Sequence, residues 1–188
     1  MTFDGVAYNL YGSFTIGSGV TLGALGGLRC FGRGTQTLTT TGKVFAGVIR
    51  VNAPGGTVTL ADSLVTSAFL SLTQGTLNLN NNTLTCATQA GIGSSAPATL
   101  AAGTGTVVVT ALTSQGFVII ATGNNLTVTG TPVIRLTYAG SNGINTSISG
   151  FTEANAISYE FTAGTYSLTF LTGGQSVRNA NFTGYAGT

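Results

Sequence analysis

Hydrophobic and polar residues alternate in short runs along most of the chain. Residues 57–60, 76–79 and 83–86 place Thr or Asn beside Leu, Val or Cys at every second position. Successive side chains of a β-strand point to opposite faces, so this pattern predicts strands with one buried face and one Thr-rich outer face. Leu84 and Val128 are therefore expected in the core. No run has the period of a useful amphipathic helix.

Short strands are expected wherever Val, Ile, Leu, Thr, Phe or Tyr cluster. We predict strands at residues 13–16, 37–39, 48–52, 57–60, 69–72, 76–79, 83–86, 106–112, 117–121, 126–129, 133–138, 159–162 and 167–171. Gly, Pro, Asn and Gln mark the turns between them. We predict these turns at residues 17–19, 54–56, 74–75, 80–82, 123–125 and 173–174.

Two all-β architectures fit this succession. A β-sandwich or jelly roll would show strands spaced about 8–12 residues apart. A β-solenoid, the parallel β-helix type of fold, would show short strands joined by tight Gly or Asn bends in coils of about 20 residues. Residues 55–88 favour the solenoid because four strands follow one another there with little polar loop between them. The β-solenoid is our prediction, and the sandwich or jelly roll is the alternative.

The run of Asn80, Asn81 and Asn82 is expected at a bend of this solenoid. Asn tolerates the left-handed backbone geometry that a tight bend requires. Stacked Asn side chains can also form a hydrogen-bonded ladder, as they do in cross-β stacks.

The chain is long enough for one domain with a real core, and we treat residues 1–188 as a single repetitive β domain. Residues 1–12 are a candidate N-terminal cap or linker. Residues 42–57 align without gaps on residues 173–188, so residues 173–188 are a candidate start of a further repeat. The chain would then end within its pattern, as a fragment does, or as a subunit completed by a neighbour does.

Charge is sparse, which limits the partners and the chemistry. Only 5% of the residues are charged, and His and Trp are absent. Nucleic-acid binding requires a dense basic stripe, whereas the six cations here are scattered. No apolar stretch of about 18 residues predicts a membrane span, and the N-terminus lacks the features of a signal peptide. We therefore predict neither a nucleic-acid nor a membrane partner.

The residues that usually carry catalysis or bind metals are few. Cys30 and Cys86 have no metal-ligand spacing and no His, so they are expected to be buried thiols on strands, with a disulfide as the other possibility. A polysaccharide-cleaving solenoid would need paired carboxylates. The acids are scattered and are expected in turns or solvated loops, although a site between subunits is a further hypothesis. They are Asp4, Asp62, Glu153 and Glu160. We predict no enzyme and no catalytic, cofactor-binding or metal-binding residue.

Two residue classes suggest binding surfaces. Thr-x-Thr pairs begin at Thr37, Thr57, Thr83 and Thr127, but their unequal spacing favours ordinary outer strand residues over an ice-binding face. Exposed Tyr side chains could stack on sugars, although aromatic residues more often pack in cores or subunit interfaces. A cap or interface is expected near the C-terminal end, where aromatic residues are dense: Phe161, Tyr166, Phe170, Phe182 and Tyr185.

Four segments, residues 10–20, 37–43, 53–62 and 75–86, resemble repetitive regions of virion proteins of tailed bacteriophages, particularly fibre-like appendages. Similar repeats occur in bacterial surface adhesins. The resemblance implies a fibrous, often homotrimeric β-structure that builds an appendage or touches a host surface. The chain is shorter than such fibres usually are, and it lacks a recognisable knob or peptidase-like module.

This resemblance gives our expected function, a structural virion protein of a tail fibre or similar appendage that provides rigidity and host-surface contact. Its expected partners are further copies of the chain, with a trimer favoured, other virion proteins, and a host-surface glycan. It would be located in the virion, after assembly in the host cytoplasm. The alternative is a bacterial surface adhesin or carbohydrate-binding module.

Overall fold

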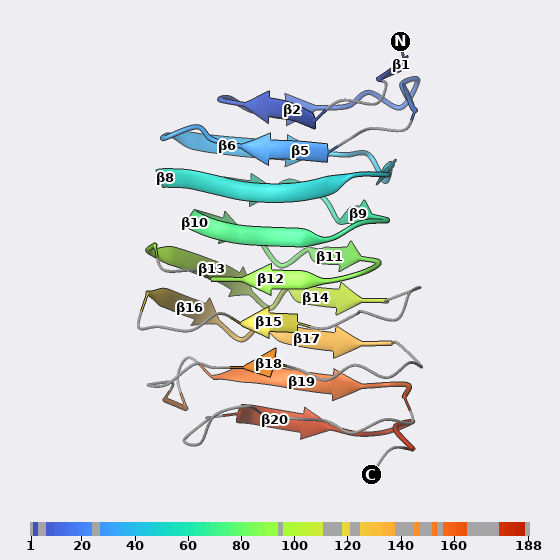
Figure 1. The fold of residues 1–188 in the computed structure, drawn as a ribbon, viewed down its shortest axis with the longest axis vertical. Coiled ribbons are helices and arrows are strands. Elements are labelled where there is room, and N and C mark those ends of the chain that lie inside the picture. The colour runs from blue at the N-terminus through green and yellow to red at the C-terminus, as the bar shows by residue number, and fades with distance from the viewer. Residues whose placement is uncertain are drawn as a thin grey trace.

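In the computed structural model, the strands lie across the long axis of the molecule and stack along it (Figure 1). The structure describes residues 2–3, 7–23, 27–93, 96–110, 118–120, 125–137, 145–146, 152–153, 156–164 and 177–186. These residues contain strands and no helix, and all their strand pairs are parallel. The molecule is therefore the predicted β-solenoid, with about six turns.

The strands of successive coils form three ladders that run along the axis. The first ladder contains β2 (Ala7–Leu10), β5 (Gly27–Cys30), the first part of β8 (Val48–Leu60), the first part of β10 (Leu70–Asn78), β12 (Ala90–Ile92), β15 (Val118–Ile120) and β18 (Asn145–Thr146). The second ladder contains β3 (Phe14–Thr15), β6 (Thr35–Thr39), the second parts of β8 and β10, β13 (Ala98–Gly103) and β16 (Leu126–Gly130).

The third ladder contains β7 (Val44–Phe45), β9 (Leu64–Thr66), β11 (Thr83–Cys86), β14 (Thr106–Val109), β17 (Val133–Leu136), β19 (Ile157–Phe161) and β20 (Val177–Asn181). At the N-terminal end, β1 (Thr2–Phe3) and β4 (Thr21–Leu22) form a separate two-stranded sheet. We call the turn between the first and second ladders the first bend, and the turn between the second and third ladders the second bend.

The register shows how one coil lies on the next. Leu28 pairs with Ile49, Ile49 with Leu70, and Leu70 with Ala90. Side-chain hydrogen bonds between neighbouring coils join residues 19 to 28 positions apart, so the coils have the expected length of about 20 residues or are somewhat longer. The coil that begins at Ala90 is longer than the coils before it, because the register partner of Ala90 in the following coil is Val118.

The core is a set of columns of inward side chains, one residue from each coil. Leu84 and Val128 are buried, as predicted, while Thr127 and Thr129 on either side of Val128 are exposed. A column of the third ladder is buried over five successive coils and ends at the exposed Ala180 of β20; the buried members are Leu64, Leu84, Val107, Ile134 and Tyr159. Because each side chain packs against its equivalents above and below, burial is continuous along the axis.

The strand bounds differ from the prediction at the first bend. Residues 48–52 and 57–60 form one strand, β8, and residues 70–72 and 76–78 likewise belong to one strand, β10. Gly55 and Gly75 adopt positive φ angles of 69° and 84°. A glycine in this conformation changes the direction of the chain without the steric cost that a Cβ would add, so pairing resumes after the bend.

Several very short strands were not predicted, including β7 and β12. The predictions for residues 111–112, 117, 121, 123–124, 138, 167–171 and 173–174 lie outside the described residues. In the aligned segments 42–57 and 173–188, Val51 lies in the first ladder, whereas its counterpart Phe182 follows β20 in the third. The alignment therefore does not join equivalent positions of two coils.

Candidate functional site

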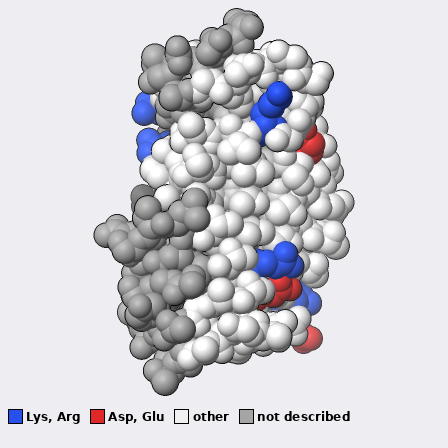
Figure 2. Space-filling model, turned by 90° about the vertical axis from the view of Figure 1, so that its right-hand side faces the viewer, with Lys and Arg blue, Asp and Glu red and all other residues white. Residues whose placement is uncertain are grey.

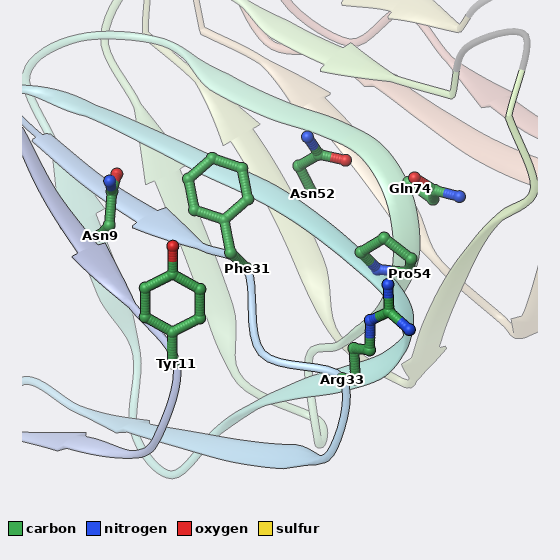
Figure 3. Close-up of a pocket in the computed structure, with 7 residues that line it drawn as sticks. All are labelled: Asn9, Tyr11, Phe31, Arg33, Asn52, Pro54 and Gln74. Carbon is green, nitrogen blue, oxygen red and sulfur yellow. The ribbon is translucent and has the colours of Figure 1, made fainter.

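A groove opens at the first bend. Its volume is about 450 Å³. Side chains from the first four coils line it: Asn9, Tyr11, Phe31, Arg33, Asn52, Pro54 and Gln74 (Figure 3). Because each coil bends at the same place, residues far apart in the sequence come to lie side by side in one surface.

Two aromatic rings form one wall of the groove. Tyr11 follows β2 and is 73% exposed, and Phe31 follows β5 in the next coil. Their ring centroids are 6.2 Å apart with an interplanar angle of 29°, an offset stack. Figure 3 shows the rings beside each other, with Arg33 next to Pro54 at the other end of the groove. An exposed aromatic wall of this kind offers a flat apolar surface to a ligand.

Three amides in the groove have unused hydrogen-bonding capacity. In the described part of the chain, no hydrogen bond is formed by the side-chain amides of Asn9, Asn52 or Gln74. Each amide can accept hydrogen bonds through its oxygen and donate two through its nitrogen. Donors and acceptors that alternate around an aromatic wall match ligands that carry several hydroxyl groups.

Three of the six cations lie on or beside the groove. Arg33 lines it, and Arg29 and Arg50 occupy paired register positions two residues before Phe31 and Asn52. None of these arginines forms an ion pair with a described residue, and the buried Nε of Arg50 has no hydrogen-bond partner there. Like charges directly opposite each other on neighbouring strands repel, so this surface favours an anion.

The other described cations are placed differently. Arg135 Nε donates to Glu160 Oε2 at 2.6 Å across the third ladder. Arg178 donates to the carbonyl oxygens of Glu153 and Ala156. Figure 2 shows the sparse charge on one face of the molecule, where wide uncharged areas separate the coloured groups. Lys43 lies at the second bend, away from the groove.

Gln36 holds the aromatic wall in place from inside the core. It is 1% exposed and belongs to a column in which the next coils carry Val58, Leu77 and Leu100. Its Nε2 donates to the carbonyl oxygens of Leu10 at 3.2 Å and Gly12 at 2.9 Å, the residues on either side of Tyr11. Its Oε1 is buried without a partner among the described residues. Gln36 could have been found in the sequence as a polar residue at an inward position of an alternating strand. We missed it because the predicted strand began at Thr37, whereas β6 begins at Thr35.

The amides at the second bend have a structural role instead. Asn80 and Asn81 have positive φ angles of 50° and 63°, as expected for an Asn bend. Asn80 and Asn82 each donate from Nδ2 to Leu60 O in the coil before, and Asn81 Oδ1 accepts from Thr104 N in the coil after. These side chains therefore bond to the backbone and side chains of neighbouring coils rather than stacking Asn on Asn.

Of the described candidate acids, Asp62 and Glu160 are not brought together as a pair. Asp62 lies in the second bend, where its carboxylate accepts hydrogen bonds from the backbone amides of Thr40 and Thr41. Glu160 lies on β19, four strands further along the third ladder than β9, or about 19 Å at normal strand spacing. Paired carboxylates of glycosidases lie within about 10 Å of each other. Glu153 is exposed, and Asp4 lies outside the described residues.

Both cysteines are buried, as predicted, and both are free thiols. Cys30 lies in β5 of the first ladder and Cys86 in β11 of the third. Burial raises the pKa of each thiol from 9.0 to about 12. The thiolate is the nucleophilic form, so both groups are protonated and unreactive near neutral pH.

The Thr residues of the second ladder are more regular in space than in sequence, whereas Thr83 and Thr85 lie on β11 of the third ladder. On the outer face of the second ladder, Thr residues of neighbouring coils pair in one continuous column: Thr35, Thr57, Thr76, Thr99 and Thr127. The neighbouring column keeps Thr37 and Thr59 but then passes through Asn78 and Ala101. Coils of different length hide this register, so unequal sequence spacing was not a valid reason to dismiss a regular face.

The aromatic residues near the C-terminal end form a cluster. The rings of Phe161 and Phe182 stack with centroids 4.9 Å apart, and Tyr185 contacts both. Phe182 remains 45% exposed, so the cluster presents apolar surface on the last described coil. Tyr166 and Phe170 lie outside the described residues.

Among the described residues, no three His, Cys, Asp or Glu side chains are grouped to hold a metal ion. The described part of the chain also contains no helix that is long and apolar enough to span a membrane. No family model matches the chain, and searches of the curated proteins and of the solved structures found no match.

Proposed function

We propose that this chain is a structural protein of a virion appendage, such as a tail fibre, in which stacked coils provide length and rigidity. The observation that carries the proposal is the stack itself, in which three parallel ladders and a continuous core run along one axis. Hydrogen bonds at the second bend add side-chain links between coils. Such a solenoid resists bending because each coil is bonded to its neighbours on every side.

We further propose that copies of the chain associate, with a trimer favoured, through the outer face of the third ladder. Val44, Val65 and Thr85 form one outward column there, without a charged residue, and the buried Val108 is the next register partner in that column. Val44 is 53% exposed, although a large apolar side chain gains free energy by leaving water. Beyond Val108 the column continues through the charged residues Arg135 and Glu160 to Asn181.

Two measurements test this proposal. Immunogold electron microscopy of particles purified from a culture that encodes the chain should label an appendage; label confined to the surface of intact cells would contradict it. Sedimentation velocity should give a trimer for the parent chain and a monomer for Val44→Glu. Thr127→Glu adds the same charge on the second ladder and should remain trimeric. A monomeric parent would remove the oligomer from the proposal.

A second candidate function is carbohydrate binding, as in an adhesin or carbohydrate-binding module, and the groove favours it. Its stacked rings and its three uncommitted amides are the chemistry that sugar rings and hydroxyl groups require. The test is a pull-down of the chain on immobilised surface polysaccharide. Tyr11→Ser should lose retention while folding normally, because this ring is mostly exposed; equal retention of parent and variant would exclude the groove.

A further inference from the structure

We propose that the groove at the first bend selects acidic saccharides, those carrying a carboxylate or sulfate group, over neutral ones. This inference rests on the second candidate function, that the groove binds a saccharide, and it names the ligand class. The feature behind it is the placement around an aromatic and amide surface of three arginines that form no ion pair with a described residue.

The arginines supply the charge selectivity. Arg33 lies within the groove, where its planar fork of donors can bind both oxygens of a carboxylate or sulfate group. Arg29 and Arg50 are register partners, and Asn9 of the groove pairs with Arg29, so the pair lies along one edge of the groove. An anionic ligand offsets the repulsion between these neighbouring cations, whereas a neutral sugar leaves it in place.

The remaining lining groups identify the ligand as a saccharide. The rings of Tyr11 and Phe31 provide a face on which a sugar ring can pack. Asn52 and Gln74, from the next two coils, provide donors and acceptors for hydroxyl groups. A single-stranded nucleic acid could also stack on aromatic rings, but its binding relies on a basic groove that follows a long run of phosphates. Three arginines at one bend match a saccharide with one or two acidic groups better than they match a long run of phosphates.

The test is a titration of the full chain with matched saccharides by isothermal calorimetry. The probes are tri-galacturonic acid, its fully methyl-esterified form, sialyllactose and lactose. We expect at least one acidic probe to bind at least tenfold more tightly than its neutral counterpart. Because exposed charge pairs are screened by salt, raising NaCl from 50 mM to 500 mM should weaken that binding at least threefold.

Matched variants assign the effect to the groove. Arg33→Gln should lower the affinity for the acidic probe at least tenfold and leave the affinity for its neutral counterpart within twofold. Lys43→Gln removes one cation near the second bend and should bind like the parent. Circular dichroism melting of each variant checks that the fold is intact; if Arg33→Gln is unstable, Arg29→Gln is the substitute, with at least a threefold loss expected.

The outcomes separate the two levels of the proposal. Equal or tighter binding of the neutral probes would overturn acidic selectivity and leave saccharide binding in place. Acidic binding that survives Arg33→Gln unchanged would overturn the assignment to the groove. If none of the four saccharide probes binds, the inference and the saccharide function are both rejected. The same holds if a dT10 oligonucleotide binds more tightly than every saccharide probe in the same buffer.

Discussion

At the scale of single residues, the surroundings decide what one side chain does. Asn80 and Asn82 use their amides to bond the backbone of the preceding coil, whereas Asn52 points its amide into the groove and bonds no described residue. The distinction cannot be read from the residue type. It depends on whether a carbonyl of a neighbouring coil lies within hydrogen-bonding distance, which the register and the bend determine together.

Gln36→Leu should loosen the aromatic wall while leaving the fold intact. Leu would complete the apolar column of Val58 and Leu77 and remove a buried, unpaired oxygen, but Gly12 O would lose its donor. We expect the free energy of unfolding to change by about 1 kcal/mol or less. Hydrogen exchange measured by mass spectrometry should show peptides covering residues 8–13 exchanging at least tenfold faster. Gln74→Leu, on the groove surface, should leave that exchange unchanged; if Gln36→Leu does so too, Gln36 does not position Tyr11.

The buried thiols predict a loss of stability in alkaline solution. Burial raises the pKa of Cys30 and Cys86 from 9.0 to about 12, so the unfolded chain releases these protons near pH 9 while the folded chain retains them. The unfolded state then binds fewer protons, and the free energy of unfolding falls as pH rises from about 9 to about 12. Urea denaturation between pH 7 and 11 should show a shallower decline for the double variant Cys30→Ala, Cys86→Ala. Parallel curves for the two proteins would contradict this assignment, and the difference at pH 7 measures the cost of the cavities.

At the scale of elements, the bends have stricter requirements than the strands. Gly75 has a φ of 84°, and a Cβ at this position would lie 2.0 Å from the carbonyl oxygen of Ala53 in the coil before. Gly42 has a similar φ of 74° but no atom within 4 Å of its Cβ position. Gly42 is therefore required only for its backbone conformation, whereas Gly75 is required both for its conformation and for the close approach of the neighbouring coil.

Comparing Gly75→Ala with Gly42→Ala separates these two requirements. Gly42→Ala should lower the free energy of unfolding by about 1–2 kcal/mol, the cost of a left-handed backbone for an L-residue. Gly75→Ala should cost at least about 2 kcal/mol more, because the backbone of the neighbouring coil must move. Urea denaturation gives both values, and Gly17→Ala, with open space and no positive φ, is the control. Equal losses at Gly75 and Gly42 would show that stacking at the first bend is not tight.

The sequence predicted the elements better than their assembly. Alternation located β11 with its observed bounds, because four residues with two buried side chains give a clear signal. β7 consists of Val44 and Phe45 alone, which is too short to show a period. The groove was not predicted, because Tyr11, Phe31 and Asn52 become neighbours only through the register, and the register depends on loop lengths that residue patterns do not specify.

At the scale of the whole molecule, coils are nearly interchangeable units, and one should be removable. Leu64 and Leu84 are register partners, so deleting residues 64–83 joins the chain at equivalent positions and keeps all three ladders in phase. We expect this variant to fold with an unchanged β-type circular dichroism spectrum per residue and a lower free energy of unfolding. Deleting residues 64–73 instead moves strands onto bends and should abolish cooperative unfolding. Cooperative unfolding of both variants, or of neither, would contradict the modular description.

The orientation of the strands also determines how the molecule would bear a load. Because the strands lie across the long axis, the hydrogen bonds between coils run along it, and a pull on the two ends would stretch all bonds of one gap together (Figure 1). Successive gaps carry the same force, so the rod is only as strong as its least bonded gap. Among the described residues of the first ladder, β8 pairs with β10 at Ile49, Arg50, Val51 and Asn52, whereas β15 and β18 pair at two positions. Tension along this ladder would therefore open it first between β15 and β18, away from the groove.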